Sequence, residues 1–174
     1  LLLAGSSGQV IAIALGAVAG YFFCRAASMA TGGALHFPVR RGVGAASLVL
    51  FGILLLGLPV AVIATGSGDL ALFDAFYRAG SLVFGGGHVV LPLLQSGVVE
   101  TGWVGDQQFL AGYGAAQAVP GPLFTFAAFL GTASTTGPGG VLGAAIALVA
   151  VFLPGFLLLV GVLPFWNSLR QRPW

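Results

Sequence analysis

Positions 107–169 form a stretch of 63 residues without one formally charged side chain. The whole chain of 174 residues carries six Arg, four acidic residues and no Lys, and 58% of it is hydrophobic. A soluble domain needs a charged surface to stay dissolved, and this chain has too few charges for one. The composition therefore predicts an all-α integral membrane protein. The net charge of +2 is small and scattered, which gives no indication of nucleic-acid binding.

Three segments are long and apolar enough for full transmembrane helices: residues 1–23, 43–65 and 141–165. Arginines lie in the loop at 25–41 and again at 170–172, so both regions are expected on the cytoplasmic side of the membrane. The turn near Asp69 and the Gly-Pro-Gly-Gly turn at 137–140 are then expected outside. The chain begins inside an apolar run without Met, and it is interpreted as one membrane domain, 1–174, that is half of something longer.

Region 84–131 lies between the two turns that are expected outside the membrane. It contains two apolar segments, each interrupted in its middle. Bare backbone polar groups in hydrocarbon cost several kcal/mol each, roughly, so an interruption is tolerated only where protein or a watery cavity satisfies the freed groups. The glycine run 85–87 makes the first interruption and the Pro-Gly-Pro run 120–122 makes the second. The pattern predicts a binding site, built either from two full-length broken helices or from two re-entrant hairpins that meet near the midplane.

A helix is expected over residues 70–84, with Asp69 as its N-cap. It has about fifteen residues, or roughly 22 Å, which is too short to span the bilayer alone. Asp74 and Arg78 are four residues apart and can pair on one face of this helix. Ionisable residues within a membrane point to function by default, whereas a neutralised pair near the surface has only a structural role; the sequence leaves both interpretations open.

Each interruption should expose the start of a new helix. Pro92 and Pro122 are suited to a first helical turn, where no backbone N–H partner is needed. Such a start leaves unpaired N–H groups at the positive end of the helix dipole. Two of these ends facing each other would bind an anion without a fixed cationic side chain. After the second arm of the first segment, Trp103 is expected as an interfacial anchor, and Asp106 as the N-cap of a helix that reaches about residue 119.

The candidate substrate-binding residues lie at the two interruptions. His88 could hydrogen-bond an oxyanion or carry a proton, or it could be structural. Gln117 could donate to a ligand or cap the broken backbone. The full set is Gly85, Gly86, Gly87, His88, Gln117, Pro120, Gly121, Pro122 and Leu123.

The sequence contains no metal-ligand spacing, nucleophile elbow or phosphate loop. Cys24 is the single cysteine, so it can form neither an internal disulfide nor a cysteine metal cluster. No catalytic residues, no metal and no cofactor are therefore expected, and a transporter is favoured over an enzyme.

The order and spacing of these motifs resemble the chromate ion transporter family, in particular the C-terminal half of a long-chain member. The resemblance covers about residues 75–164, and it is carried by Phe84-Gly85-Gly86-Gly87, Pro92, Val98-Val99, Gly102-Trp103, Phe109, Gln117 and Pro120-Gly121-Pro122.

This resemblance implies export of chromate, an oxyanion shaped like sulfate, across the bacterial inner membrane by a multi-pass protein that uses the proton gradient. It also implies a second homologous half, either in the same chain or in another subunit, or a homodimer. Three alternatives stay open: a passive channel, a transporter of another small anion such as sulfate, and a half that does not transport without its partner.

Overall fold

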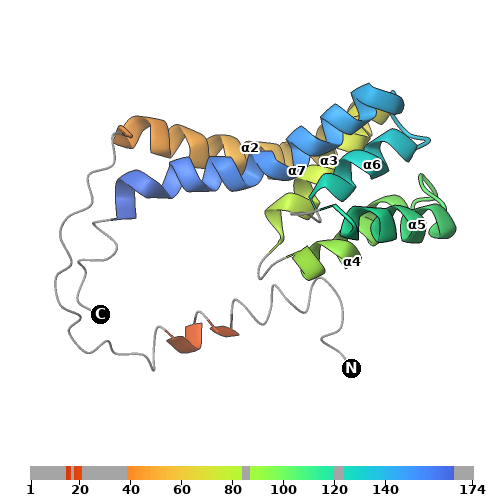
Figure 1. The fold of residues 1–174 in the computed structure, drawn as a ribbon. Coiled ribbons are helices and arrows are strands. Elements are labelled where there is room, and N and C mark those ends of the chain that lie inside the picture. Colours follow the sequence, from red (N-terminus) through yellow and green to blue (C-terminus); the bar gives the residue numbers. More distant parts are fainter. Residues whose placement is uncertain (1–14, 17, 21–38, 84–86, 120–123, 167–174) are drawn as a thin grey trace.

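The computed structural model describes residues 15–16, 18–20, 39–83, 87–119 and 124–166. All regular structure in these residues is helical. The elements are α2 (Arg41–Thr65), α3 (Gly68–Ser81), α4 (Gly87–Val98), α5 (Asp106–Gln117), α6 (Thr125–Ala133), α7 (Gly140–Val162) and the 3-10 turn η1 (Leu163–Phe165) (Figure 1). The first expected span, apart from short helical pieces at 15–16 and 18–20, lies outside the described residues, as do most of the arginine segment 25–41 and all of 170–172.

Two helices of the described residues are long and apolar enough to cross a membrane: Arg41–Thr65, with 25 residues, and Gly140–Phe165, with 26. At 1.5 Å per residue each is about 38 Å long, against a hydrocarbon core of about 30 Å. Both apolar helices are thus confirmed, with bounds within two residues of the sequence-based expectation. They lie side by side, because a Cβ on Gly44 of α2 would stand 2.8 Å from Pro164 Cγ (Figure 1). We call α2 and α7 the spanning pair.

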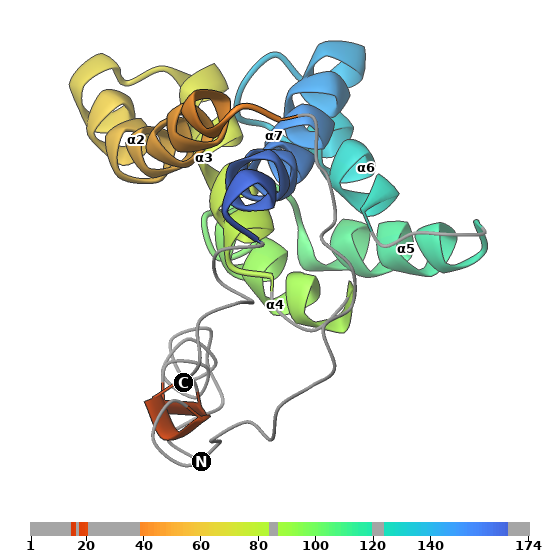
Figure 2. The same cartoon turned by 90° about the vertical axis from the view of Figure 1, so that its left-hand side faces the viewer.

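Helix α7 is the element against which the others are packed. Figure 2 shows α2 and α3 on one side of it and α6 on the other, with α4 and α5 beyond them. The contact of α7 with α6 is made by backbone: a Cβ on Gly131 would overlap the carbonyl oxygen of Gly143, and a Cβ on Gly143 would overlap that of Gly131. Small residues let helices approach this closely in a membrane, where packing drives association.

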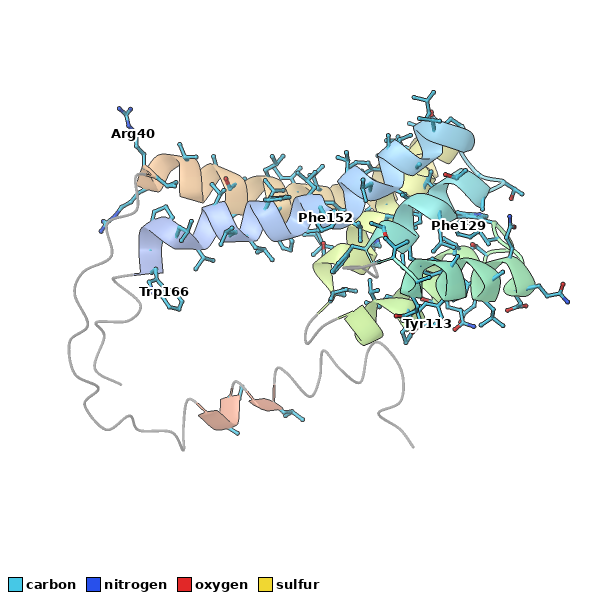
Figure 3. All side chains as sticks on the ribbon, in the orientation of Figure 1. Arg40, Tyr113, Phe129, Phe152 and Trp166 are labelled. Carbon is cyan, nitrogen blue, oxygen red and sulfur yellow. The ribbon has the colours of Figure 1, made fainter. Side chains whose placement is uncertain are left out.

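The buried core lies between α3, α6 and α7. Its fully buried side chains include Phe76 of α3, Phe126 and Leu130 of α6, and Ala147 and Ala150 of α7. By contrast, large apolar side chains on the outer faces of the spanning pair are exposed, as expected for a surface that meets lipid: Val49, Ile53, Leu56, Val60, Ile63, Phe156 and Leu159 (Figure 3).

Three connections gather at one end of the bundle. A Cβ on Gly68, at the start of α3, would lie 2.9 Å from the backbone nitrogen of Gly137 in the α6–α7 loop. The carbonyl oxygen of Trp103, in the turn after α4, accepts hydrogen bonds from the backbone nitrogen of Thr135 at 3.0 Å and from its Oγ1 at 3.2 Å. The α2–α3, α4–α5 and α6–α7 connections therefore share one end, and α3 and α5 both start there.

Helices α3–α4 and α5–α6 form two antiparallel arms, which we call the two hairpins. A Cβ on Gly97 of α4 would lie 3.6 Å from Ala75 Cβ of α3, and the rings of Phe109 and Phe126 pack edge to face between α5 and α6 with centroids 5.0 Å apart. Each hairpin leaves the shared end and returns to it. This arrangement favours re-entrant hairpins over full-length broken helices.

Both expected N-caps were assigned to the wrong residue. The N-cap of α3 is Ser67, whose Oγ accepts a hydrogen bond from the Leu70 nitrogen at 3.5 Å, and the N-cap of α5 is Gly105. Asp69 and Asp106 lie in the first turns instead. An acidic side chain in the first turn is stabilised by the helix dipole without capping a backbone nitrogen. An aspartate near the start of a helix is therefore equally compatible with the N-cap and with the first turn.

The expectation that Pro92 starts a helix is wrong. Helix α4 begins at Gly87, and Pro92 lies inside it. Proline has a fixed φ that suits a helix but no N–H to donate. The carbonyl of residue 88 therefore has no i+4 helical donor, so the effect of Pro92 falls on the first turn of α4 and not on its start. Helix α6 begins at Thr125, and Pro122 lies outside the described residues.

Candidate anion site

The structure describes the helices on both sides of each interruption, and the interruptions themselves lie largely outside the described residues. Helix α3 ends at Ser81 and α4 begins at Gly87, while α5 ends at Gln117 and α6 begins at Thr125. Of the predicted site, Gly87 and His88 form the start of α4, where only the backbone is described. Gly85, Gly86, Pro120, Gly121, Pro122 and Leu123 lie outside the described residues.

The described residues next to the two interruptions contact α7 at the same level. A Cβ on Gly80, near the end of α3, would overlap the carbonyl oxygen of Val151 and lie 3.0 Å from Pro154 Cγ. Phe124, just before α6, packs against Phe152 with ring centroids 5.1 Å apart. Val151 is about 16 Å along α7 from Gly140 at 1.5 Å per residue, which is close to half of a hydrocarbon core of about 30 Å.

Helices α4 and α6 both start on the interrupted side of their hairpins and run back to the shared end. Their N-terminal, electropositive ends are therefore the ends next to the interruptions. Within the first turn of α6 the Ala127 nitrogen donates to the Phe124 carbonyl at 3.1 Å. The orientation of both helix dipoles is the one that an anion held between the hairpins requires.

Gln117 is the predicted site residue whose side chain is described. It is exposed at the end of α5, and its Nε2 donates to the Tyr113 hydroxyl at 2.7 Å. Tyr113 in turn packs edge to face against Phe126, with centroids 5.9 Å apart (Figure 3). In the described part of the chain the Gln117 amide is thus held by a side chain and caps no backbone carbonyl, which leaves its role toward a ligand as a prediction.

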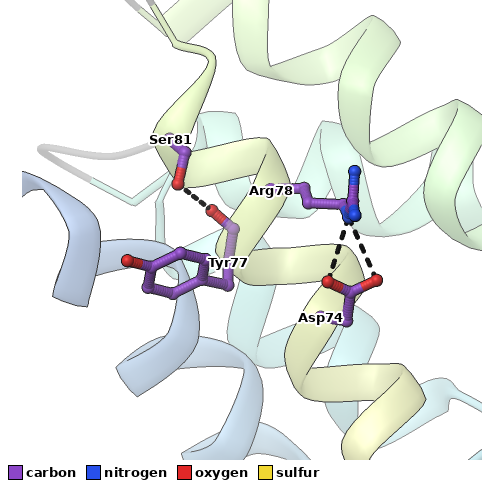
Figure 4. A network of polar contacts seen from close by, with 4 residues as sticks. All are labelled: Asp74, Tyr77, Arg78 and Ser81. Atoms are coloured by element: carbon purple, nitrogen blue, oxygen red, sulfur yellow. Dashed lines mark hydrogen bonds and ion pairs between the residues drawn. The ribbon is translucent and has the colours of Figure 1, made fainter. Parts of the chain in front are cut away.

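Asp74 and Arg78 form the ion pair that their spacing predicts. Arg78 Nε donates to both carboxylate oxygens, at 3.0 and 3.1 Å (Figure 4). The Arg78 side chain is 42% exposed and the Asp74 side chain 16%. On the opposite side of α3, Tyr77 is fully buried and its hydroxyl donates to the Phe51 carbonyl of α2 at 3.1 Å. One face of α3 is therefore fixed to the spanning pair, and the other presents an arginine.

Arg78 lies in a groove between α3 and α4 that sequence reasoning did not predict. The groove has a volume of about 200 Å³ and is lined by Ala75, Arg78, Ala79, Leu82, Leu93, Ser96 and Gly97. The small residues at 75, 79 and 97 leave the space. Two alanines four residues apart on α3 were the available signal, but the matching position on α4 becomes evident only when the hairpin is folded.

Comparison with known proteins identifies a family for this chain. A family profile described as chromate transporter matches residues 70–174. A probable chromate transport protein of Synechococcus elongatus is 37% identical over 107 residues, which are 61% of this chain and 26% of that protein. The chromate transport protein of Pseudomonas aeruginosa is 36% identical over 112 residues, 64% of this chain and 26% of that protein.

A shorter relative, the uncharacterized transporter YwrA of Bacillus subtilis, is 38% identical over 107 residues, 60% of this chain and 58% of that protein. The chain thus spans about a quarter of the length of the two chromate transport proteins and somewhat more than half of YwrA. No solved structure matches the chain.

Proposed function

The chain belongs to the chromate transporter family, and from this premise we propose that it is one half of a membrane transporter that exports chromate across the bacterial inner membrane. In this proposal the proton gradient drives export, and the oxyanion is held by backbone between the two hairpins. The site comprises the glycine run with His88, and Gln117 with the Pro-Gly-Pro run and Leu123.

One observation carries the proposal. The residues flanking the two interruptions, Gly80 and Phe124, contact α7 at neighbouring positions, Val151 and Phe152. Two interruptions at one depth can contribute to one site. The α4 and α6 dipoles point their positive ends to this depth, which stabilises a negative charge, and glycine lets an anion approach the backbone closely.

The hairpin arrangement supports a second half. Helix α5, which packs on α6 and not on α7, exposes Gln117 on its outer side, together with small residues and Leu110. A polar side chain exposed to hydrocarbon is unfavourable, so a homologous half, in the same protein or in a second subunit, would close this side. The chain covers about a quarter of the chromate transport proteins that it matches, which leaves room for such a half.

The test is uptake of radiolabelled chromate into inverted membrane vesicles, with the chain in its natural full-length protein. Gly86→Leu and Gly121→Leu are expected to abolish uptake while membrane insertion stays normal, because a leucine side chain would occupy the space of the anion. Gly57→Leu is the matched control, since Gly57 is exposed on α2 and a Cβ there meets nothing within 4 Å.

Two further arms of this experiment separate the alternatives. Sulfate in excess should compete with chromate, and an uncoupler should stop concentrative uptake; uptake that only equilibrates, with or without the uncoupler, would indicate a channel. Wild-type uptake by both glycine variants would rule out the proposed site.

A further inference from the structure

Arg78 is a half-buried cation on α3, and its ion pair with Asp74 engages only one of its donor groups. It is two residues before Gly80, and Gly80 contacts α7 about halfway along its length. A guanidinium has five N–H donors. The Nε–H is the group that meets Asp74, at 3.0 and 3.1 Å, and among the described residues the two Nη groups have no partner. Four donors therefore remain for a ligand.

The two members of the pair have different surroundings. The Asp74 side chain is 16% exposed and does not line the groove, whereas the Arg78 side chain is 42% exposed and forms part of its wall (Figure 4). The carboxylate thus offsets part of the cost of an arginine within the membrane region, and Arg78 contributes to the wall of the groove. A pair whose purpose was only neutralisation would need neither this asymmetry nor a groove.

The groove suits a small oxyanion. Its volume of about 200 Å³ holds several water molecules, given that about 15 Å³ of such volume admits one. It runs from Ala75 and Gly97 to Leu82 and Leu93, and so from the shared end of the bundle towards the first interruption. Apart from Ser96, its remaining walls are apolar. An apolar environment strengthens the electrostatic attraction between Arg78 and an anion.

We propose that Arg78 is an oxyanion-binding residue in the α3–α4 groove, where it holds chromate between the first interruption and the shared end of the bundle, with Asp74 as the residue that positions and partly neutralises it. This inference rests on the proposed function and adds to it a fixed cation, which the sequence-based site did without. Arginine suits the task because its planar fork can bind two oxygen atoms of one anion.

The decisive variant exchanges the two charges, Asp74→Arg together with Arg78→Asp, in the natural full-length protein. The exchange keeps an i,i+4 ion pair on α3 and moves the cation one helical turn away from the groove. We expect normal insertion and a half-saturating chromate concentration raised by about tenfold or more, since lost charge-assisted hydrogen bonds have effects of this size. A purely structural pair would survive the exchange with an unchanged half-saturating concentration, which would overturn the proposal.

A single substitution of Asp74 distinguishes an Arg78 that binds chromate from an ion pair that is only structural. Asp74→Asn frees the guanidinium and is expected to lower the half-saturating concentration several-fold. If the pair is only structural, Asp74→Asn instead leaves an unpaired arginine, reduces the amount of inserted protein and does not tighten binding. Arg41→Gln is the charge-matched control, because Arg41 is exposed at the start of α2; the same rise there as in the exchange variant would assign the effect to general electrostatics and contradict the proposal.

Lipid phosphate shares the chemistry of the proposed ligand. Measurements in vesicles of phosphatidylcholine alone, and with added phosphatidylglycerol, separate the two sources: the effect of the charge exchange should be the same in both. An effect present only with the anionic lipid would place a headgroup in the groove and refute chromate binding. Absence of chromate uptake by the wild-type protein would instead refute the proposed function itself, which keeps the two failures distinct.

Discussion

The spanning pair and the two hairpins differ in composition as well as in length: α2 and α7 are apolar almost throughout, whereas α3 and α5 contain several charged or amide side chains. Helices α2 and α7 have 25 and 23 residues, continue past an internal proline each, and expose large side chains on their outer faces. The hairpin helices have 9 to 14 residues; α3 and α6 pack against α7, and α4 and α5 pack against α3 and α6. Length and hydrophobicity together therefore separate the two helices that can span a membrane from the four that are too short to do so.

The largest expected effect concerns the side of the membrane to which the α4–α5 turn belongs. Thr65, Thr101 and Trp166 are exposed, so each can be replaced by a single cysteine in a Cys24→Ser background. The hairpin arrangement predicts that a membrane-impermeant thiol reagent labels Thr65→Cys and Thr101→Cys from one side and Trp166→Cys only from the other. Labelling of Thr101→Cys together with Trp166→Cys would mean that α3–α4 crosses the membrane, and the distinction between the two regions would no longer hold.

A large effect is also expected where a hairpin rests on the spanning pair. Gly80→Leu places a side chain against the Val151 carbonyl, and because that contact is backbone, it can relax only by moving α3. We expect the free energy of unfolding, measured by SDS titration in bicelles, to fall by about 3 kcal/mol, the upper part of the range for overpacking. Gly52→Leu on α2, where a Cβ meets nothing within 4 Å, should change it by less than about 0.5 kcal/mol.

A small effect sharpens the comparison at the α2–α3 contact. Tyr77→Phe removes a hydroxyl that donates to the Phe51 carbonyl at 3.1 Å. That oxygen keeps its helical partner, so the same titration should show a loss of about 0.6 kcal/mol, typical of interhelical hydrogen bonds in membranes. Ser47→Ala, which removes a bond within α2 alone, should cost less; a larger loss at Ser47 would argue against α3 being fixed by this bond.

The sequence was sufficient for features that depend on nearby residues. Continuous apolarity located both members of the spanning pair, and a spacing of four located the ion pair of Asp74 and Arg78. It was insufficient where several residues offer the same local chemistry. Either Ser67 or Asp69 can begin α3, and Pro92 is compatible with both the first turn and the interior of a helix.

Features that depend on distant residues could not be predicted from the pattern at all. The hydrogen bonds between Trp103 and Thr135 join positions 32 residues apart, and they decide that the α4–α5 turn lies at the shared end. The level at which the end of α3 and the start of α6 meet α7 is likewise set by the contacts of Gly80 and Phe124. Each contact follows from the three-dimensional course of the chain, which hydropathy does not encode.

The packing of α3 against α7 also affects the order in which the helices can assemble during synthesis. Gly80 leaves the ribosome well before Val151, against which it packs; at about 5–20 residues per second the delay lasts several seconds. During this interval the α5–α6 hairpin lacks α7, and α3 has only its contact with α2, where the Tyr77 hydroxyl donates to the Phe51 carbonyl. We therefore expect the four short helices to reach their final packing only after α7 has been synthesised.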